Sequence, residues 1–318
     1  MKVIEHISGS KQTAFSFEIL PPLKGNSIRK VYSVVDKLRE FDPKYINITS
    51  HHSEYIYKTM PDGSINRVNV RKRPGSVAIA SAIQNKYGIT AVPHIICKGF
   101  TMDETEYALI DLNFLGVHDL LLLRGDAKGV DPVQGCDDAQ RHAHATDLQR
   151  QVNNFNIGIA VDNSTFEANE TPFSYGMACY PEKHEEAPNM ESDIYYAKQK
   201  VNNGAGYLVT QMFFDNEKYY SFLDRCRKEG ITVPIIPGIK PIVFKDQLNV
   251  LPRVFRSEIP EALASELRKC ATDEAAKEVG VEWCTAQCKD LIKNHVPSLH
   301  FYTFMATDSV CRVAKEVY

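Results

Sequence analysis

The chain has 318 residues, of which 43% are hydrophobic and 24% are charged, and its formal net charge is -3. This is the composition of a globular protein, and the length allows one large domain or two small ones. The small net charge and the lack of a long basic run argue against binding to nucleic acid or to an anionic membrane. The sequence has no signal-peptide pattern and no apolar run of about 20 residues, so we expect a cytoplasmic protein whose eight cysteines are reduced.

The first half of the chain alternates short apolar runs with amphipathic segments, which predicts strands alternating with helices. The run LLLLRGD is continuously apolar before its charged end, as is typical of a parallel strand that is buried on both faces. In chain order we expect a strand at 15–20, a helix at 27–40, a strand at 45–49, a helix after Pro74, a strand at 91–97, a helix that begins with the capping-box pair Thr101 and Glu104, and a strand at 120–126.

The second half begins irregularly and then returns to the same alternation. Residues 127–171 mix Gly, Asn, Asp and His around one helical segment at 145–152, and IGIAV at 157–161 is either a further strand or part of the excursion. After it we expect a strand at 174–182, a helix at 192–203, a strand at 207–214, a helix at 217–229, a strand at 233–239, two or three helices over 245–294, a strand at 299–304 and a final helix.

Eight strands alternating with helices over about 300 residues favour an α/β fold of the (β/α)8 TIM-barrel class. The competing class is a doubly wound open sheet, but the sequence has neither a GxGxxG nor a GxxxxGK[ST] pattern. We therefore expect residues 1–318 to form a single barrel domain with an irregular loop insertion at about 127–171.

Polar residues occur at the carboxyl ends of most predicted strands, which is where such barrels place their chemistry. Any one of them has an ordinary structural explanation, since a lone strand His or Tyr is more often a packed core residue. Glu18 is harder to explain in that way, because it lies in a run of Phe, Ile, Leu and Pro where an ionised carboxylate is costly. A carboxyl group in such a place is expected to have a raised pKa, as general acids do. The histidine pairs His51–His52 and His142–His144 have no obvious acidic or cysteine partners in the sequence, so no metal site is expected.

Seven collinear segments resemble the methylenetetrahydrofolate reductases. They are FSFEILPP at 15–22, VPHIIC at 92–97, LLLRGD at 121–126, YPEKHEEAPN at 180–189, the segment from Lys200 to VTQMFFD at 215, IIPGIKP at 235–241 and HFYT at 300–303. Each match is weak alone, but together they run in order from about residue 12 to the end of the sequence.

The resemblance implies a flavoprotein that uses FAD, with NADH or NADPH as the co-substrate that is oxidised first. Methylenetetrahydrofolate would then be reduced to methyltetrahydrofolate on the same face of the barrel, in ping-pong order, as part of methionine biosynthesis. It also implies a homo-oligomer, and the lack of a C-terminal regulatory domain implies no inhibition by S-adenosylmethionine. The sequence does not choose between the two nicotinamides.

The resemblance also assigns roles to residues. Glu18 matches the general acid, and Asp126 matches an aspartate near the flavin that also meets the pterin. Substrate contacts are implied for Glu18, Gln211, Leu251 and Tyr302. The positions that match FAD contacts are Thr49, His94, Leu123, Arg124, Gly125, Asp126, His144, Tyr180, His184, Asp193 and Lys200.

Three positions depart from the family pattern. His144 stands where a tyrosine is common, Gln199 where an arginine is common, and FYTFMA where bacterial members have FYTLNR. Two other hypotheses remain: a pterin-binding barrel that handles one-carbon groups without a flavin, and a degenerate binding protein without enzymatic activity.

Overall fold

The structure is a computed structural model, and it describes residues 1–8, 12–125, 140–304 and 306–318. Its main sheet has nine strands in the order β10-β11-β1-β2-β5-β6-β7-β8-β9. The strands at the two ends of this order, β9 and β10, are separated in the chain only by Pro237. This is the strand order of a TIM-like barrel, and the predicted (β/α)8 class is confirmed.

The strands lie close to where the sequence predicts them. The predicted strand at 233–239 is interrupted at Pro237, which cannot donate a ladder hydrogen bond. The segment 157–161 is not a strand and forms only an isolated bridge between Ile159 and Thr165. The strands are β1 (Ala14–Ile19), β2 (Tyr45–Ile48), β3 (Glu54–Thr59), β4 (Ile65–Val70), β5 (Thr90–Ile96), β6 (Asp119–Leu123), β7 (Ser174–Cys179), β8 (Tyr207–Thr210), β9 (Ile235–Ile236), β10 (Gly238–Ile239) and β11 (Ser298–Tyr302).

Helices α4, α6, α7 and α10 begin at residues whose side chains accept a free backbone N–H group, namely Thr101, Asn189, Asp215 and Thr272. The predicted capping box is present, because Thr101 and Glu104 each accept a backbone N–H of the other. No helix in the described ranges is long and apolar enough to cross a membrane. The helices are α1 (Val3–Ser8), α2 (Arg29–Leu38), η1 (Arg39–Phe41), α3 (Ser76–Tyr87), α4 (Met102–Phe114), α5 (Ala145–Asn156), α6 (Met190–Asn202), α7 (Asn216–Lys228), α8 (Gln247–Phe255), α9 (Glu261–Lys269), α10 (Asp273–Lys293) and α11 (Thr307–Val317).

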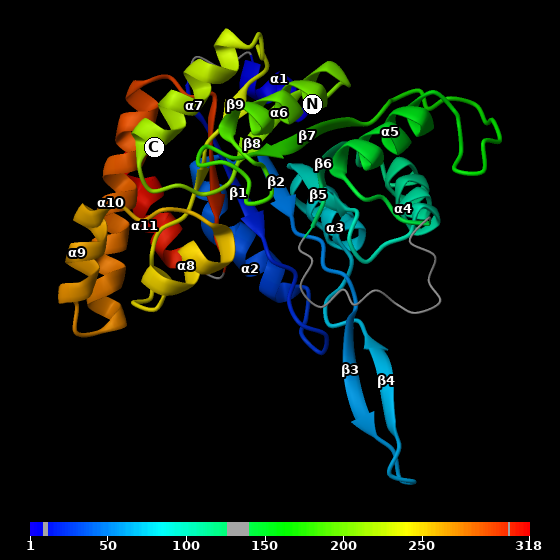
Figure 1. Ribbon diagram of the computed structural model, residues 1–318, viewed down its shortest axis with the longest axis horizontal. Coiled ribbons are helices and arrows are strands. Elements are labelled where there is room, and N and C mark those ends of the chain that lie inside the picture. Colours follow the sequence, from blue (N-terminus) through cyan, green and yellow to red (C-terminus); the bar gives the residue numbers. More distant parts are fainter. Residues whose placement is uncertain (9–11, 126–139, 305) are drawn as a thin grey trace. The chain divides into compact units, whose positions relative to one another are not determined.

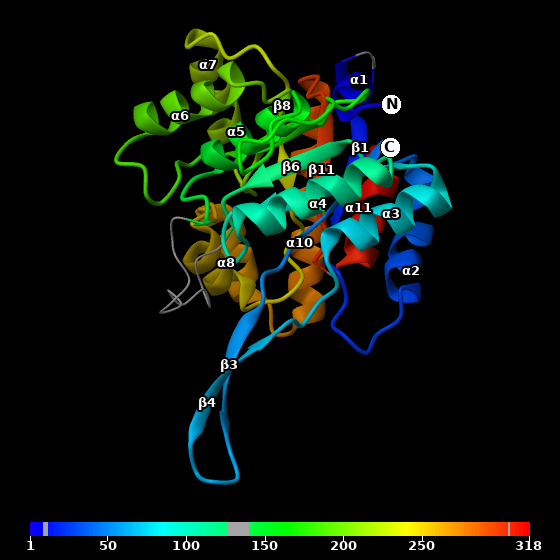
Figure 2. The ribbon, with the colours of Figure 1, turned by 90° about the vertical axis from the view of Figure 1, so that its right-hand side faces the viewer.

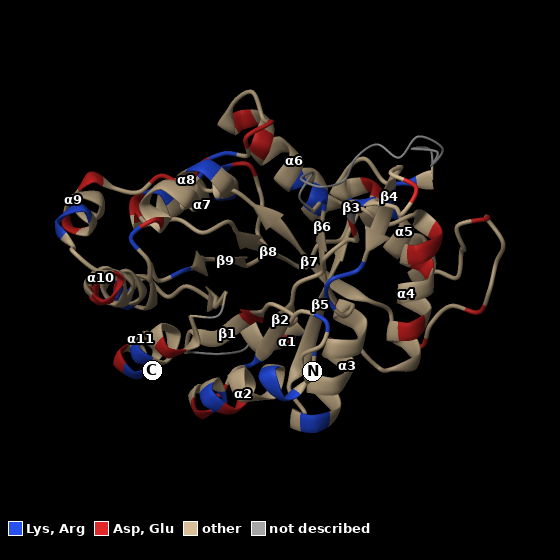
Figure 3. Cartoon of the chain, turned by 90° about the horizontal axis from the view of Figure 1, so that it is seen from below, with Lys and Arg blue, Asp and Glu red and all other residues tan. Residues whose placement is uncertain are grey.

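The chain divides into two compact units. The first unit comprises Met1–Leu20, Tyr32–Asn47 and Tyr175–Tyr318, and the second comprises Pro21–Val31 and Ile48–Ser174. In the first unit, β11 lies between β1 and β10 in parallel register. Figure 3 shows that most charged residues lie on helices and connecting segments, whereas the strands carry few.

The two faces of β1 differ in chemistry. Phe15 packs against Phe301 and against Tyr318 at the end of the chain. Because side chains alternate along a strand, Ser16 and Glu18 share the opposite face. On that face the Ser16 hydroxyl lies 3.0 Å from His300 Nδ1 and contacts Ser298. Thus β1 has one apolar face towards the C-terminal helix and one polar face.

The second unit contains a hairpin that the sequence did not predict. Strands β3 and β4 pair in antiparallel fashion from Glu54 opposite Val70 to Thr59 opposite Ile65. Figures 1 and 2 both show this hairpin extending away from α3, α4 and β5. Helix α3 packs on β5 and on α4, and α5 packs on α4 and β6. Helix α5 and residues 140–171 belong to the predicted insertion, whereas 126–139 lie outside the described residues.

Candidate functional site

Glu18 lies near the carboxyl end of β1, opposite Tyr302 in the register with β11. It is buried, with 6% of its surface exposed. Thr303 donates to the backbone carbonyl of Glu18 over 2.6 Å, which joins the ends of the two strands. Burial raises the pKa of Glu18 to about 8, and the positive charge of Lys240 lowers it by a smaller amount. The carboxyl group therefore keeps its proton at neutral pH, in the direction that the apolar sequence around it predicts.

Lys240 is a second buried ionisable group in the first unit, and it is not among the site residues predicted from the sequence. It follows β10 directly and is 4% exposed. Burial lowers its pKa to about 8, and the neighbouring Cys284 and Glu18 raise it by smaller amounts. The signal was present in the sequence, because a lysine inside IIPGIKP is as unusual as a glutamate inside FSFEIL.

Tyr302 occupies the end of β11 beside Glu18 and β10. Its hydroxyl donates to the Thr210 carbonyl over 2.6 Å, and burial raises its pKa well above the ordinary value. The Gly238 N–H donates to the Thr210 hydroxyl over 2.9 Å, so β8, β10 and β11 meet around Thr210. The tyrosine is thus fixed by a hydrogen bond, and its ring is presented at the same level as Glu18.

Gln211 follows β8 and lines a small hollow that is open to solvent. Its Oε1 accepts the Met212 N–H over 2.9 Å, which leaves the amide NH2 group available as a donor. Tyr180 and Glu182 line the same hollow from the segment after β7. Burial raises the pKa of Glu182 to about 7, and hydrogen bonds from the Glu258 N–H to its carboxylate oppose this shift.

Leu251 is buried in an apolar cluster at 2% exposure, on α8. Met212 and Phe214, which follow β8, belong to the same cluster, and Tyr302 and Phe304 pack against it. Leu251 therefore supports the segment after β8 and the end of β11, which carry the predicted substrate contacts Gln211 and Tyr302.

Four predicted FAD contacts lie close together between β7 and the end of α6. The rings of Tyr180 and His184 meet edge to face at 4.7 Å. Asp193 accepts the backbone N–H of His184 over 2.9 Å, and it is buried. Lys200 donates to the Ala178 carbonyl over 2.8 Å, and burial lowers its pKa. Each of these polar side chains thus has a partner within the protein, and together they fix the segment that carries the aromatic pair.

In the second unit, five predicted contacts lie at the carboxyl ends of β2, β5 and β6. The Thr49 hydroxyl lies 3.0 Å from His51 Nε2. His94 is 4% exposed and stands opposite Leu121 in the register of β5 and β6. Its carbonyl accepts the Ser76 hydroxyl over 3.0 Å, which ties β5 to the start of α3.

The segment after β6 turns sharply. Leu123 stands opposite Ile96 in the sheet, and the Arg124 carbonyl accepts the Lys98 N–H. Gly125 has φ +82°, and a Cβ there would lie 3.2 Å from the Ile96 side chain. Only glycine adopts this turn without strain. The next residue, Asp126, was predicted to be catalytic and lies outside the described residues.

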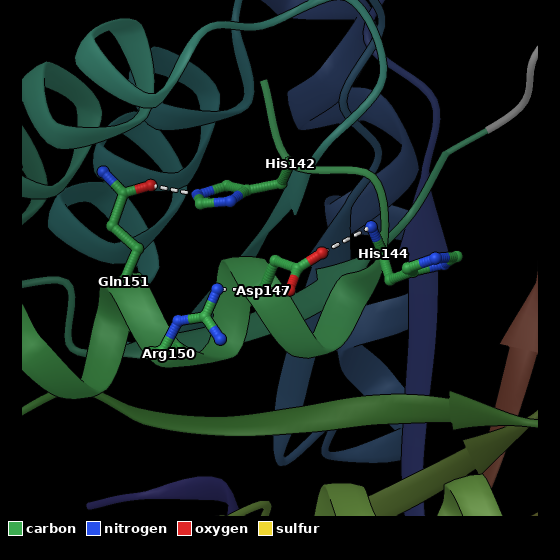
Figure 4. A network of polar contacts seen from close by, with 5 residues as sticks. All are labelled: His142, His144, Asp147, Arg150 and Gln151. Carbon is green, nitrogen blue, oxygen red and sulfur yellow. Dashed lines mark hydrogen bonds and ion pairs between the residues drawn. The ribbon is translucent and has the colours of Figure 1, made fainter. Parts of the chain in front are cut away.

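His144 precedes α5 and acts through its backbone. Its N–H donates to the Asp147 carboxylate over 3.0 Å, which satisfies a group at the start of the helix. Figure 4 shows its ring pointing away from Asp147 and Arg150, while His142 contacts Gln151. The imidazole of His144 is thus not used to cap the helix.

In the first unit the candidate residues offer carboxyl, phenol and amide groups, and in the second unit they offer hydroxyl, imidazole and guanidinium groups. Within the described residues, no group of three His, Cys, Asp or Glu could hold a metal ion. The family model of methylenetetrahydrofolate reductase matches residues 2–317. The chain belongs to the methylenetetrahydrofolate reductase family.

The chain aligns over nearly its whole length with individual relatives of the methylenetetrahydrofolate reductase family, and its sequence identity to them is modest. A 5,10-methylenetetrahydrofolate reductase of Escherichia coli is 29% identical over 92% of this chain and 86% of its own length. A probable methylenetetrahydrofolate reductase (NADPH) of Caenorhabditis elegans is 29% identical over 99% of this chain, but over 43% of its own length. An Arabidopsis thaliana methylenetetrahydrofolate reductase (NADH) is 28% identical over 95% of this chain and 48% of its own length. The chain thus spans about half the length of these eukaryotic relatives.

A solved structure supports the same fold for this member of the methylenetetrahydrofolate reductase family. An uncharacterized protein from Clostridium thermocellum that binds two copies of 5-methyl-5,6,7,8-tetrahydrofolic acid superposes with a TM-score of 0.55 at 14% identity. The superposition covers 98% of each chain. At this identity the likeness concerns the fold.

Proposed function

We propose that this protein is a flavin-dependent reductase that converts 5,10-methylenetetrahydrofolate to 5-methyltetrahydrofolate at the expense of NADH or NADPH. The observation that carries the proposal is Glu18, a buried carboxyl group at a strand end, whose pKa burial raises to about 8. A carboxylic acid that remains protonated at neutral pH is the group that this reaction needs. Because the chain belongs to the methylenetetrahydrofolate reductase family, we assign Glu18 a role in the reaction of that family.

Glu18 acts as the general acid. Its proton goes to a ring nitrogen of methylenetetrahydrofolate, the bond from that nitrogen to the methylene carbon breaks, and an electrophilic iminium group results. Glu18 becomes a carboxylate and takes its next proton from solvent. The low exposure of Glu18 matters here, because a solvated carboxyl group would already be ionised at neutral pH.

The residues present fit FAD by the chemistry of their donors. In the second unit Thr49, His94 and Arg124 offer a hydroxyl, an imidazole and a guanidinium, which suit the hydroxyl and pyrophosphate groups of a dinucleotide. In the first unit, the edge-to-face pair of Tyr180 and His184 offers aromatic surface, and Asp193 and Lys200 hold it in place. When bound, FAD would supply hydride transfer from the nicotinamide to the methylene carbon.

The folate would be held by side chains around Glu18. Gln211 offers an amide to the pterin, and Tyr302 offers an aromatic edge that its hydrogen bond to Thr210 keeps in place. Leu251 supports both from the apolar cluster beneath them. Asp126 and His144 remain predicted contacts on the strength of the resemblance.

The first test is the absorption spectrum of the purified protein, before and after the anaerobic addition of NADH or NADPH. We expect flavin bands that bleach on addition and return when methylenetetrahydrofolate is added. The Glu18→Gln variant should keep the bleaching and lose the return, whereas Glu40→Gln, which removes an exposed carboxyl group, should behave like the wild type.

Two results would count against the proposal. A colourless protein that takes up no added FAD would favour the flavin-free pterin barrel instead. Folate reduction by Glu18→Gln at the wild-type rate would show that Glu18 is not the acid.

A further inference from the structure

Lys240 lies at the level of Glu18 in the first unit. In the register of β10 and β11, Gly238 is opposite His300 and Ile239 is opposite Phe301, so the next residue, Lys240, reaches the level of Tyr302. Tyr302 is in turn opposite Glu18 across β11 and β1. Lys240, Tyr302 and Glu18 therefore form one row across three adjacent strands.

The Lys240 ammonium lies against a group of packed aromatic rings. It lies 4.9 Å from the centroid of the Phe304 ring. The Phe304 ring stacks on Tyr302 at 6.1 Å, and Phe255 packs against it from α8. Phe304 has φ +33°, a left-handed conformation that is strained for a bulky residue and places its ring here at some cost. The contact between Lys240 and Phe304 therefore gives the ammonium a defined place beside the row.

The ionisable groups around Lys240 come from three packed elements. Glu18 belongs to β1, Tyr302 to β11 and Cys284 to α10. The charge of Lys240 lowers the pKa of Glu18, and the charge of Glu18 raises the pKa of Lys240. Burial keeps Tyr302 neutral, since its pKa lies well above 10. Glu18 is therefore the carboxyl group that shares this buried place with the ammonium.

We propose that Lys240 is a positioning residue of the reductase reaction, whose buried ammonium stabilises the carboxylate that Glu18 becomes after its proton has left. The inference rests on the proposed function for its place in the reaction. A carboxylate left alone in a buried site is costly, and an opposite charge in the same row reduces that cost. Lys240 neither gives nor takes a proton in this step, and the proton that restores Glu18 comes from solvent.

The test begins with a property that does not depend on catalysis. The infrared C=O band of the protonated Glu18 carboxyl, assigned by its loss in Glu18→Gln, is titrated in the wild type, Lys240→Met, Lys240→Arg and Lys228→Met. We expect the midpoint to rise by about one pH unit in Lys240→Met and to stay near the wild-type value in Lys240→Arg, which keeps the charge. Lys228 is exposed on α7, so its variant should titrate like the wild type.

The second measurement follows the two half-reactions by stopped flow. We expect Lys240→Met to reduce flavin with nicotinamide at the wild-type rate and to reduce folate roughly tenfold more slowly at pH 7, with the alkaline limb of the folate profile moved to higher pH. Lys240→Arg should restore most of the folate rate.

The outcomes separate the inference from the proposed function. An unchanged Glu18 midpoint in Lys240→Met overturns the inference, whatever the protein catalyses. Loss of the folate step in both Lys240→Met and Lys240→Arg, with the midpoint shifted only in the former, also overturns it, since charge alone would then not suffice. A shifted midpoint together with full folate reduction by Glu18→Gln would show that the two residues are coupled, but it overturns the role of both Glu18 and Lys240 in the reaction.

Discussion

The backbone of Gly238 lies against the ring of Tyr302. A Cβ at Gly238 would be 2.5 Å from Tyr302 Cε2 and 2.4 Å from the Thr210 carbonyl oxygen. Both distances are far below a normal contact, so the hydrogen bond from Tyr302 to Thr210 depends on the absence of a side chain at position 238. The glycine of IIPGIKP is thus explained by close approach and not by a turn.

Replacing Gly238 with alanine should therefore displace Tyr302 and lower the free energy of unfolding. We expect a loss of about 1–3 kcal/mol, the usual effect of overpacking a buried site. Urea unfolding followed by circular dichroism measures it. Gly206→Ala is the matched control in the same unit, because a Cβ there meets only the Tyr175 carbonyl, at 3.8 Å. Equal stability of the two variants would contradict the contact.

Glu18 should make the protein less stable as pH rises from about 4.5 to about 8. Its pKa is raised by burial from 4.5 to about 8, so in this window the folded chain binds the proton and the unfolded chain does not. Stability falls with pH wherever the folded state binds more protons, by on the order of 5 kcal/mol for a shift of this size.

Denaturant unfolding of the wild type and Glu18→Gln across pH 4–9 tests this dependence. The variant cannot ionise at position 18, so its advantage over the wild type should grow through the window and level off above pH 8. A constant difference between the two proteins would show that Glu18 titrates alike in both states.

Lys240 should have the opposite dependence at higher pH. Burial lowers its pKa from 10.5 to about 8, so between these values the unfolded chain binds the proton and the folded chain does not. Stability contributed by this site rises with pH in that window. At pH 7 the buried ammonium is a cost, and we expect Lys240→Met to be about 1–2 kcal/mol more stable than the wild type.

Unfolding of Lys240→Met at pH 7 and pH 10 measures this difference, which should shrink at the higher pH. Lys228→Met, at an exposed position, should change stability by less than about 0.5 kcal/mol at either pH. A Lys240→Met variant that is less stable than the wild type at pH 7 would mean that the ammonium is well paired in the folded protein.

The alternation of apolar and amphipathic segments was enough to predict the barrel, because each parallel strand is a short apolar run and each helix has its own periodicity. Glu18 could be singled out for a related reason, since a charged residue in an apolar strand stands out. The hairpin β3–β4 escaped prediction because its strands, EYIYKT and INRVNV, mix apolar and polar residues without a continuous apolar run, and β4 is mostly exposed.

The role of Lys240 could not be read from the sequence, because it depends on register. Positions 18, 240 and 302 are far apart in the chain, and only the pairing of β1, β11 and β10 brings them to one level. The same holds for Asp193, whose sequence context marks the first turn of a helix. Its hydrogen bond to the His184 N–H appears only in the folded chain.

Removing the Asp193 carboxylate should loosen the segment that carries Tyr180 and His184. We expect Asp193→Ala to lose about 1–3 kcal/mol of unfolding free energy, because a buried N–H is left without its acceptor. If this segment contacts FAD as proposed, the affinity of the variant protein for FAD should also fall, by roughly tenfold.

Two variants sharpen this experiment, with FAD affinity measured by fluorescence titration and stability by urea unfolding. Asp193→Asn keeps an oxygen that can accept the His184 N–H, so it should recover most of the stability. Ser192→Ala changes the neighbouring residue, whose backbone N–H is bonded to Asn189, and should leave both quantities near the wild-type values. If Asp193→Ala loses stability but binds FAD with full affinity, the structural role of Asp193 is supported. The same result would remove the Tyr180–His184 segment from the proposed FAD site.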